Sequence, residues 1–151
     1  MILKLKHFEK LSISELYQLL QLRSEVFIVE QNCVYQDIDD KDRLGYHLLG
    51  FLDSQLVACA RILPVGVSYS DYSSIGRVCT KQTHRQHGLG KKLMKQAILN
   101  CQELFPTENI KISAQSYLLK FYIELGFSAI GEEYLEDDIP HRAMVYSFLT
   151  D

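Results

Sequence analysis

Apolar and polar residues alternate over the first residues of the chain and then recur at the intervals of a helix. Leu3 and Leu5 share one side of an extended segment while lysines face the other, which predicts a half-solvated strand. Ser12 and Glu15 have the spacing of a capping box, in which each side chain satisfies a backbone N–H at the start of a helix. The residues that follow at helical intervals are Leu16, Leu19, Leu20, Arg23, Phe27 and Glu30. The pattern therefore predicts a strand and then a helix, with two charged residues on an otherwise apolar stripe.

An acidic segment, residues 35–42, carries four aspartates and interrupts the helical pattern. A calcium-binding EF-hand loop that began at Asp37 would need an oxygen ligand, a glycine and a glutamate at its fifth, sixth and twelfth positions. Those positions hold Lys41, Asp42 and Leu48, so the segment does not have the EF-hand pattern. We interpret it as a solvated acidic loop, which would attract a cationic substrate if it borders a cleft.

The rest of the chain alternates between short apolar runs and two further helical patterns. Two runs separated by Asp53-Ser54-Gln55 have the spacing of an antiparallel hairpin, and Gly126 is the residue type that favours a left-handed helix cap. The predicted strands are 46–52, 56–63, 75–80, 110–114, 127–134 and 143–149, the last two joined by a loop at 136–141, and the predicted helices are 89–104 and 116–125. Strands mixed with helices, including a strand–helix–strand crossover, predict an α/β domain with a partly antiparallel sheet.

The length and charge of the chain limit its possible functions. Its 151 residues fit one domain, 1–151, with a core large enough to fold without a disulfide or zinc. With 16 basic and 19 acidic side chains the net charge is −3, which argues against binding of nucleic acid or an anionic membrane. Charged residues interrupt every apolar run well before the ~20 residues of a membrane-spanning helix, and the N-terminus lacks the apolar stretch of a signal peptide. We therefore expect a cytoplasmic protein.

Residues 78–93 run from a strand through a glycine-containing turn into a helix. Free N–H groups and the positive end of the dipole at a helix start bind anions, and glycines let the backbone approach them. Arg85, Lys91 and Lys92 add positive charge at this end, where basic side chains do not favour the helix dipole. A P-loop would need a magnesium-binding hydroxyl after the lysine, and a dinucleotide fingerprint would need a third glycine where the chain has Leu93. The segment therefore predicts a phosphate site of another kind.

The turn Arg85-x-x-Gly88-x-Gly90 resembles the pyrophosphate loop of the GNAT N-acetyltransferases, which lies at the same strand-to-helix junction. The later segments Ser113-Ala114-Gln115-Ser116 and Phe121-Tyr122-Ile123-Glu124-Leu125-Gly126-Phe127 are similar to a second motif of that family. Residues 27–39, 75–78 and 138–141 are similar to its small bacterial ElaA-like branch. The resemblance covers essentially the whole chain. It implies a single GNAT-like α/β domain, with a mixed central sheet of about six to seven strands flanked by about four helices.

The resemblance also implies acetyl-CoA as the cosubstrate and no metal. Val78 and Thr80 would present backbone groups to the thioester and the pantetheine arm, and residues 85–91 would hold the pyrophosphate through main-chain N–H groups. Many relatives carry Asn where this chain has Gln115-Ser116, so the polar contact from this turn to pantetheine differs here. The cofactor-binding residues implied in this way are Val78, Cys79, Thr80, Arg85, Gln86, His87, Gly88, Leu89, Gly90, Lys91 and Gln115.

Direct acetyl transfer to an amine needs a proton donor for the departing thiolate, and Tyr122 occupies the matching motif position. A phenol of ordinary pKa ~10 is protonated at neutral pH, so Tyr122 is the expected general acid. Glu30 is the first candidate for the general base, because burial on the apolar stripe would make its carboxylate more basic and let it act through water. His141 is a further candidate, as a proton relay. The competing interpretation of Glu30 is a structural ion pair with Arg23, Arg61 or Arg77.

A covalent acetyl-cysteine route is less favoured. Cys79 lies in the strand beside the expected thioester, but Arg77 is the only basic neighbour in that strand that would lower the pKa of its thiol. The four cysteines form no C-x-x-C pair, so no zinc site or redox motif is predicted and buried reduced thiols are expected.

Together these inferences predict an enzyme that transfers an acetyl group directly from acetyl-CoA to a primary amine of a small molecule or peptide. The acidic segments 35–42 and 132–138 favour a cationic amine. The alternatives are a non-catalytic acyl-CoA-binding sensor or partner-binding module and, from the phosphate turn alone, a nucleotide-binding protein. We expect a monomer or homodimer, with neither a nucleic acid nor a membrane as partner.

Overall fold

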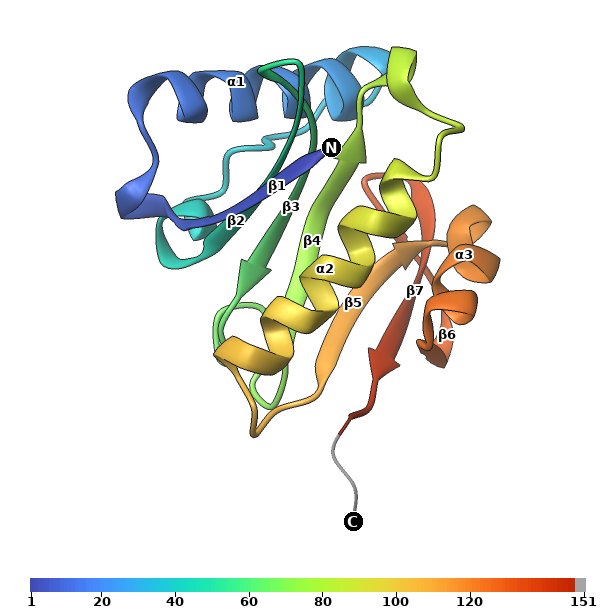
Figure 1. Ribbon diagram of the computed structural model, residues 1–151. Coiled ribbons are helices and arrows are strands. Elements are labelled where there is room, and N and C mark those ends of the chain that lie inside the picture. Colours follow the sequence, from blue (N-terminus) through green and yellow to red (C-terminus); the bar gives the residue numbers. More distant parts are fainter. Residues whose placement is uncertain (149–151) are drawn as a thin grey trace.

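Seven strands form one mixed sheet in the computed structural model, which describes residues 1–148 (Figure 1). The order across the sheet is β1-β2-β3-β4-β5-β7-β6, and β4 and β5 are the parallel pair within this range. The expected mixed α/β architecture is confirmed. The predicted ends of the last strand and of the domain, at residues 149 and 151, lie outside the described residues. The strands are β1 (Ile2–His7), β2 (Tyr46–Leu52), β3 (Gln55–Leu63), β4 (Ser73–Thr80), β5 (Ile110–Gln115), β6 (Ser128–Glu136) and β7 (Ile139–Tyr146).

Helices cover both faces of the sheet. Along β2, Leu48 belongs to the core cluster that includes Leu93 of α2, whereas Leu49 belongs to the cluster that includes Leu19 of α1. Neighbouring residues of a strand point to opposite faces, so α1 and α2 lie on opposite sides, with α2 in front of the central strands in Figure 1. The helices are α1 (Ile13–Arg23), the π-helical η2 (Ser24–Glu30), α2 (Leu89–Leu104) and α3 (Leu119–Leu125), and the 3-10 turns are η1 (Phe8–Lys10), η3 (Lys41–Leu44), η4 (Gln82–His84) and η5 (Ser116–Leu118).

The first helix begins as predicted and then changes its winding. Ser12 Oγ accepts a hydrogen bond from Glu15 N at 3.0 Å, and Glu15 Oε1 accepts one from Ser12 N at 2.8 Å, which confirms the capping box. From Ser24 onward the helix is a π-helix, which closes i→i+5 hydrogen bonds and turns less per residue. The interval of seven residues from Arg23 to Glu30 is about two turns of an α-helix, but it is less than two turns of this π-helix. Arg23 is buried but Glu30 is exposed, so the prediction that both share one apolar stripe is wrong for Glu30.

The acidic segment 35–42 is not a solvated loop. Asp37 and Asp42 are buried against arginines from other elements. Arg23 Nε of α1 donates to Asp37 at 2.9 Å, its Nη1 donates to Asp42 at 2.7 Å, and Arg61 Nη1 of β3 donates to Asp42 at 3.0 Å. The interpretation failed because these partners lie far away in the sequence, and so the local run of carboxylates looked unpaired. Asp37, Asp39 and Asp42, three of its four aspartates, are paired with arginines within the protein, and the segment gives little support to a cationic substrate.

The two central strands separate along their length. β4 and β5 are paired at Ser73↔Ile110 and Ser74↔Lys111, and beyond these residues they diverge toward the start of α2 (Figure 1). The register between β3 and β4 also shifts near Arg77, which has a φ of +48°. Such an irregularity bends a strand and increases its twist. The divergence opens the sheet at its centre and creates space for a ligand between strands.

Candidate active site

A cavity of about 640 Å³ occupies the opening between β4 and β5. Glu30 of η2, Tyr122 of α3 and His141 of β7 all line it, although they come from three separate elements. The predicted site residues that line the cavity are Glu30, Val78, Cys79, Thr80, Arg85, Gly90, Gln115, Tyr122 and His141. The other predicted residues, Gln86, His87, Gly88, Leu89 and Lys91, are not part of this lining and form the turn and first residues of α2.

The turn before α2 leaves its backbone open. Gly88 has a φ of +73°, and a Cβ at this position would meet no atom within 4 Å. The N–H of Lys92 bonds to the carbonyl of Gly88 at 3.1 Å, and the N–H groups before it have no acceptor within the helix. Lys91 and Lys92 are exposed at the same end. The helix dipole, free N–H groups and basic side chains together suit an anionic ligand.

The Arg85 side chain joins η2 to the end of β4. Its Nε and Nη2 donate to the carbonyl of Thr80 at 3.1 and 2.9 Å, and both Nη atoms donate to the carboxylate of Glu30. The hydrogen bond to Glu30 raises the pKa of the Arg85 guanidinium, so this group is charged throughout the physiological pH range. Glu30 therefore pairs with Arg85 and not with Arg23, Arg61 or Arg77, the partners expected from the sequence. The charge of Arg85 is thus compensated by Glu30, and its main-chain N–H donates to the carbonyl of Gln82 at 3.4 Å, so Arg85 is engaged within the protein at both its side chain and its backbone.

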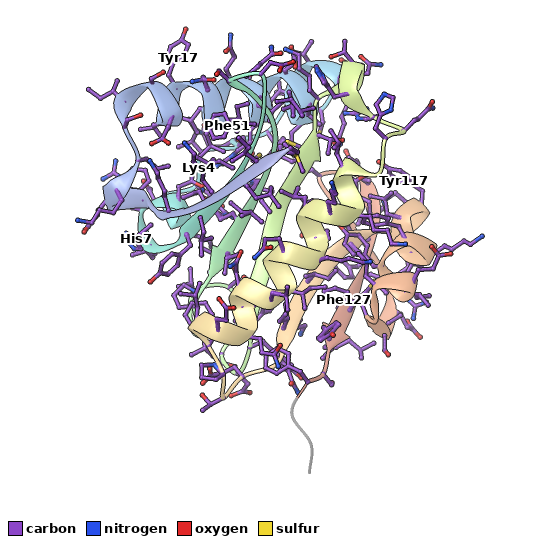
Figure 2. All side chains as sticks on the ribbon, in the orientation of Figure 1. Lys4, His7, Tyr17, Phe51, Tyr117 and Phe127 are labelled. Carbon is purple, nitrogen blue, oxygen red and sulfur yellow. The ribbon has the colours of Figure 1, made fainter. Side chains whose placement is uncertain are left out.

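Tyr122 lies in an aromatic environment at the cavity wall. Its side chain is 8% exposed, with ring centroids 5.1 Å from Phe121 and 5.8 Å from Phe127, which Figure 2 labels. Burial, with a smaller effect of Tyr117, raises the pKa of Tyr122 to about 12. No hydrogen-bond partner for its hydroxyl is found among residues 1–148. The phenol is thus protonated at neutral pH and free to donate to a ligand.

His141 is held at both ring nitrogens. The prediction placed it in a loop at 136–141, but β6 runs to Glu136 and β7 begins at Ile139, which buries His141 in a strand. Its Nδ1 lies 2.6 Å from the carbonyl oxygen of Ile139, and its Nε2 lies 3.3 Å from Oε2 of Glu136. The ring stacks on Tyr134 with centroids 6.2 Å apart. The sequence did not reveal Glu136 as a partner, because its contact depends on the register of the hairpin.

Two further predicted residues have structural partners. The sulfur atoms of Cys79 and Cys59 are 3.5 Å apart across β3 and β4. The contact with Cys59 and burial raise the pKa of the Cys79 thiol well above its ordinary range, which makes it a poor nucleophile. Gln115 Nε2 donates to Gln31 Oε1 at 3.5 Å, which connects the end of β5 to the end of η2.

A family model described as "Acetyltransferase (GNAT) domain" matches residues 13–148. The chain belongs to the GNAT acetyltransferase family. This GNAT chain is 44% identical over 142 residues to the protein ElaA of Escherichia coli (strain K12), with 91% of each chain covered. Membership of the family supports an acyl-CoA-dependent acyltransferase activity and agrees with the GNAT-like, ElaA-like character expected from the motifs.

Solved structures agree with this GNAT assignment. The crystal structure of an acyl-CoA N-acyltransferase from Pseudomonas aeruginosa has a TM-score of 0.90 and 41% identity, covering 97% of this chain and 100% of that chain. Escherichia coli ElaA gives a TM-score of 0.90 at 40% identity, with the same coverage. An aminoglycoside 6'-N-acetyltransferase complexed with coenzyme A shares the fold, with a TM-score of 0.74 at 14% identity over 100% and 99% of the two chains. Within residues 1–148, no helix of this GNAT domain has the length and apolar character needed to span a bilayer.

Proposed function

We propose that this protein is an acetyl-CoA-dependent N-acetyltransferase that moves an acetyl group directly to a primary amine of a small molecule or peptide. The observation that carries the proposal is the position of Tyr122 at the wall of the cavity between the diverging strands. It is a protonated phenol whose hydroxyl has no hydrogen-bond partner among residues 1–148. The GNAT family membership supports the acyl-CoA half of the reaction.

In this proposal the backbone from Arg85 to Lys91 binds the pyrophosphate of acetyl-CoA, and the pantetheine arm follows β4 between Val78 and Thr80. The N–H of Val78 polarises the thioester carbonyl and stabilises the oxyanion that forms there. A neutral amine attacks the carbonyl carbon, and the hydroxyl of Tyr122 protonates the departing CoA thiolate. Direct transfer is preferred over an acetyl-cysteine intermediate because the Cys79 thiol has a raised pKa.

The base in this scheme is Glu30, acting through a water molecule, or water itself, and His141 relays protons. The ion pair with Arg85 gives Glu30 a second role, as an anchor of the phosphate turn. The variant Glu30→Gln separates the two roles. Loss of a base lowers kcat, whereas loss of an anchor raises the KM for acetyl-CoA while kcat is retained.

The proposal is tested by measuring thiol release from acetyl-CoA with a broad panel of primary amines. We expect release that depends on the acceptor, and about a 100-fold or greater fall in kcat for Tyr122→Phe with unchanged binding of acetyl-CoA. Tyr17→Phe is a matched control, because Tyr17 is 71% exposed and points outward from α1 (Figure 2). Binding of acetyl-CoA without turnover of any amine would contradict the proposal and favour a non-catalytic sensor or partner-binding module.

A further inference from the structure

A polar wall formed by β5, β6 and β7 borders the cavity. Ser113, Glu136 and His141 of this wall all line the cavity. Ser113 Oγ donates to Glu136 Oε1 at 3.3 Å and is also hydrogen-bonded to the hydroxyl of Tyr134. The other carboxylate oxygen, Oε2, is 3.3 Å from His141 Nε2. The four side chains therefore form one connected group, in which Glu136 is the only carboxylate.

Glu136 differs from two of the other carboxylates around the cavity. Glu30 is paired with Arg85, and Asp39 is paired with Arg61 and Arg77. The third, Asp137 in the turn after β6, is not part of the group that Glu136 forms with the hydroxyls and the imidazole. Glu136 contacts a hydroxyl and an imidazole, and no arginine or lysine among residues 1–148 pairs with it. Its side chain is 52% exposed, so a ligand in the cavity can reach it. A carboxylate of this kind beside aromatic rings is suited to bind an ammonium group.

The imidazole of His141 is positioned to take a proton. When Nδ1 carries a proton, it donates to the carbonyl of Ile139, 2.6 Å away. A proton that arrives at Nε2 is then stabilised by Glu136 Oε2, 3.3 Å away. The charged or titratable groups around this ring are Glu136 and Tyr134 on β6, Asp137 in the turn and, beyond them, Tyr69. Burial raises the pKa of the Tyr69 phenol to about 12, with smaller contributions from Tyr134 and Glu136.

We propose that Glu136 binds the ammonium group of the acceptor and that His141 Nε2, in place of Glu30 or water, is the group that removes its proton, so that the acceptors are small primary alkylamines that are charged at neutral pH. This inference rests on the proposed function, because it assigns the acceptor half of that reaction.

The proton balance is complete without a further reactant. R–NH₃⁺ gives one proton to Nε2, and the resulting R–NH₂ forms the C–N bond as the C–S bond breaks. The thiolate receives the proton of Tyr122. The nitrogen of the acetylated amine then loses a second proton, which passes through solvent to the Tyr122 phenolate and restores the phenol. The imidazolium of His141, which Glu136 stabilises, releases its proton to water. The net products are R–NH–acetyl, CoA–SH and one proton.

The test compares pairs of amines of similar size and different basicity. Ethylamine and propylamine are ammonium ions at pH 7.5. Their partners of similar size, 2,2,2-trifluoroethylamine and aminoacetonitrile, carry an electron-withdrawing group next to the amine-bearing carbon, so they are largely neutral and need no base before attack. We expect Glu136→Gln to lower kcat/KM for the two alkylamines by about 100-fold and to leave the two neutral amines nearly unchanged. Glu133→Gln is the matched control, because Glu133 is an exposed residue of the same strand that does not line the cavity.

The possible results separate this inference from the proposed function. Equal effects of Glu136→Gln on both amines of each pair, or no effect, would overturn the inference and leave the proposed function standing. Turnover only of amines other than small alkylamines would also overturn it. No turnover of any amine by the wild-type protein would remove the proposed function and the inference together. The melting temperature and acetyl-CoA affinity of Glu136→Gln are measured alongside, and both are expected to match the wild type because the side chain is half exposed.

Discussion

Arg23 is 1% exposed and still charged, because aspartates surround it. Hydrogen bonds to Asp42 and the charge of Asp37 outweigh the cost of burying the guanidinium, so its pKa is raised overall. Burial would raise the pKa of the Asp42 carboxyl group, but Arg23 and Arg61 lower it overall. Equal numbers of opposite charges make the network neutral and fix the segment after η2 against the sheet. Its members are Arg23, Arg61, Arg77, Asp37, Asp39 and Asp42.

At the residue scale, Asp42→Asn is expected to lower the free energy of unfolding at pH 7 by about 3–5 kcal/mol, because two buried arginines lose a shared partner. The pKa of Asp42 in the folded protein lies below the ~3.9 of an unfolded chain. Its contribution is therefore present above pH ~4 and is lost as the pH falls below that value. Urea unfolding at pH 7 and at lower pH measures both effects.

Asp40→Asn is the control for this prediction. Asp40 is exposed with a φ of +65°, a conformation that Asn adopts readily, and a change within about 0.5 kcal/mol is expected. Similar losses of stability in the two variants would show that the buried network is not the cause.

At the scale of elements, α3 ends where the motif predicts. Gly126 has a φ of +111°, and a Cβ there would lie 2.8 Å from Cε2 of Tyr146 on β7. The glycine thus serves two purposes: it accepts a backbone conformation that other residues avoid, and it lets the aromatic ring pack close to the end of the helix. This contact joins α3, which carries Tyr122, to the strand that carries His141.

Gly126→Ala is expected to reduce the free energy of unfolding by about 2–3 kcal/mol, from backbone strain and the clash with the ring. Gly131→Ala is the matched control, since Gly131 has a φ of +70° but a Cβ there meets nothing within 4 Å. A cost of about 1 kcal/mol is expected for it. Equal midpoints of urea unfolding for the two variants would refute the contribution of the Tyr146 contact.

At the scale of the whole molecule, the separation of β4 and β5 divides the sheet into two arms. The strands pair at two positions near their start, and the arms are also linked by the contact between Gln31 and Gln115. A ligand that fills the cavity touches both arms, and the energy of its binding adds to the stability of the folded state.

Acetyl-CoA at about 100 times its Kd is expected to stabilise the protein by about 2.7 kcal/mol. For a chain of this length, that raises Tm by about 5–10 °C. ATP at the same concentration is the control and is expected to give a much smaller rise. An equal rise with ATP would favour a nucleotide-binding protein, and no rise with acetyl-CoA would contradict the proposed cosubstrate. Differential scanning calorimetry gives both values.

Much of the fold could be read from the chain because its signals are local. The capping box at Ser12, the strand periodicity and the cap at Gly126 each depend on residues within one or two turns. The same holds for the turn at residues 85–91, where glycines and basic residues adjoin the start of α2. The prediction of the last hairpin was less accurate. It left Ile139 to His141 in a loop, because an acidic turn and a proline mask the strand signal.

The sequence by itself determined the order of elements, the GNAT-like motifs and the positions of Tyr122 and of the glycine-containing turn before α2. Only the tertiary structure decided which charges are paired: Glu30 with Arg85, and three of the four aspartates of 35–42 with arginines of α1, β3 and β4. It also placed Glu136 beside His141. The physical reason is that periodicity records which face of an element is apolar, whereas the partner of a charge depends on elements far apart in the chain and, at Glu30, on the winding of a π-helix.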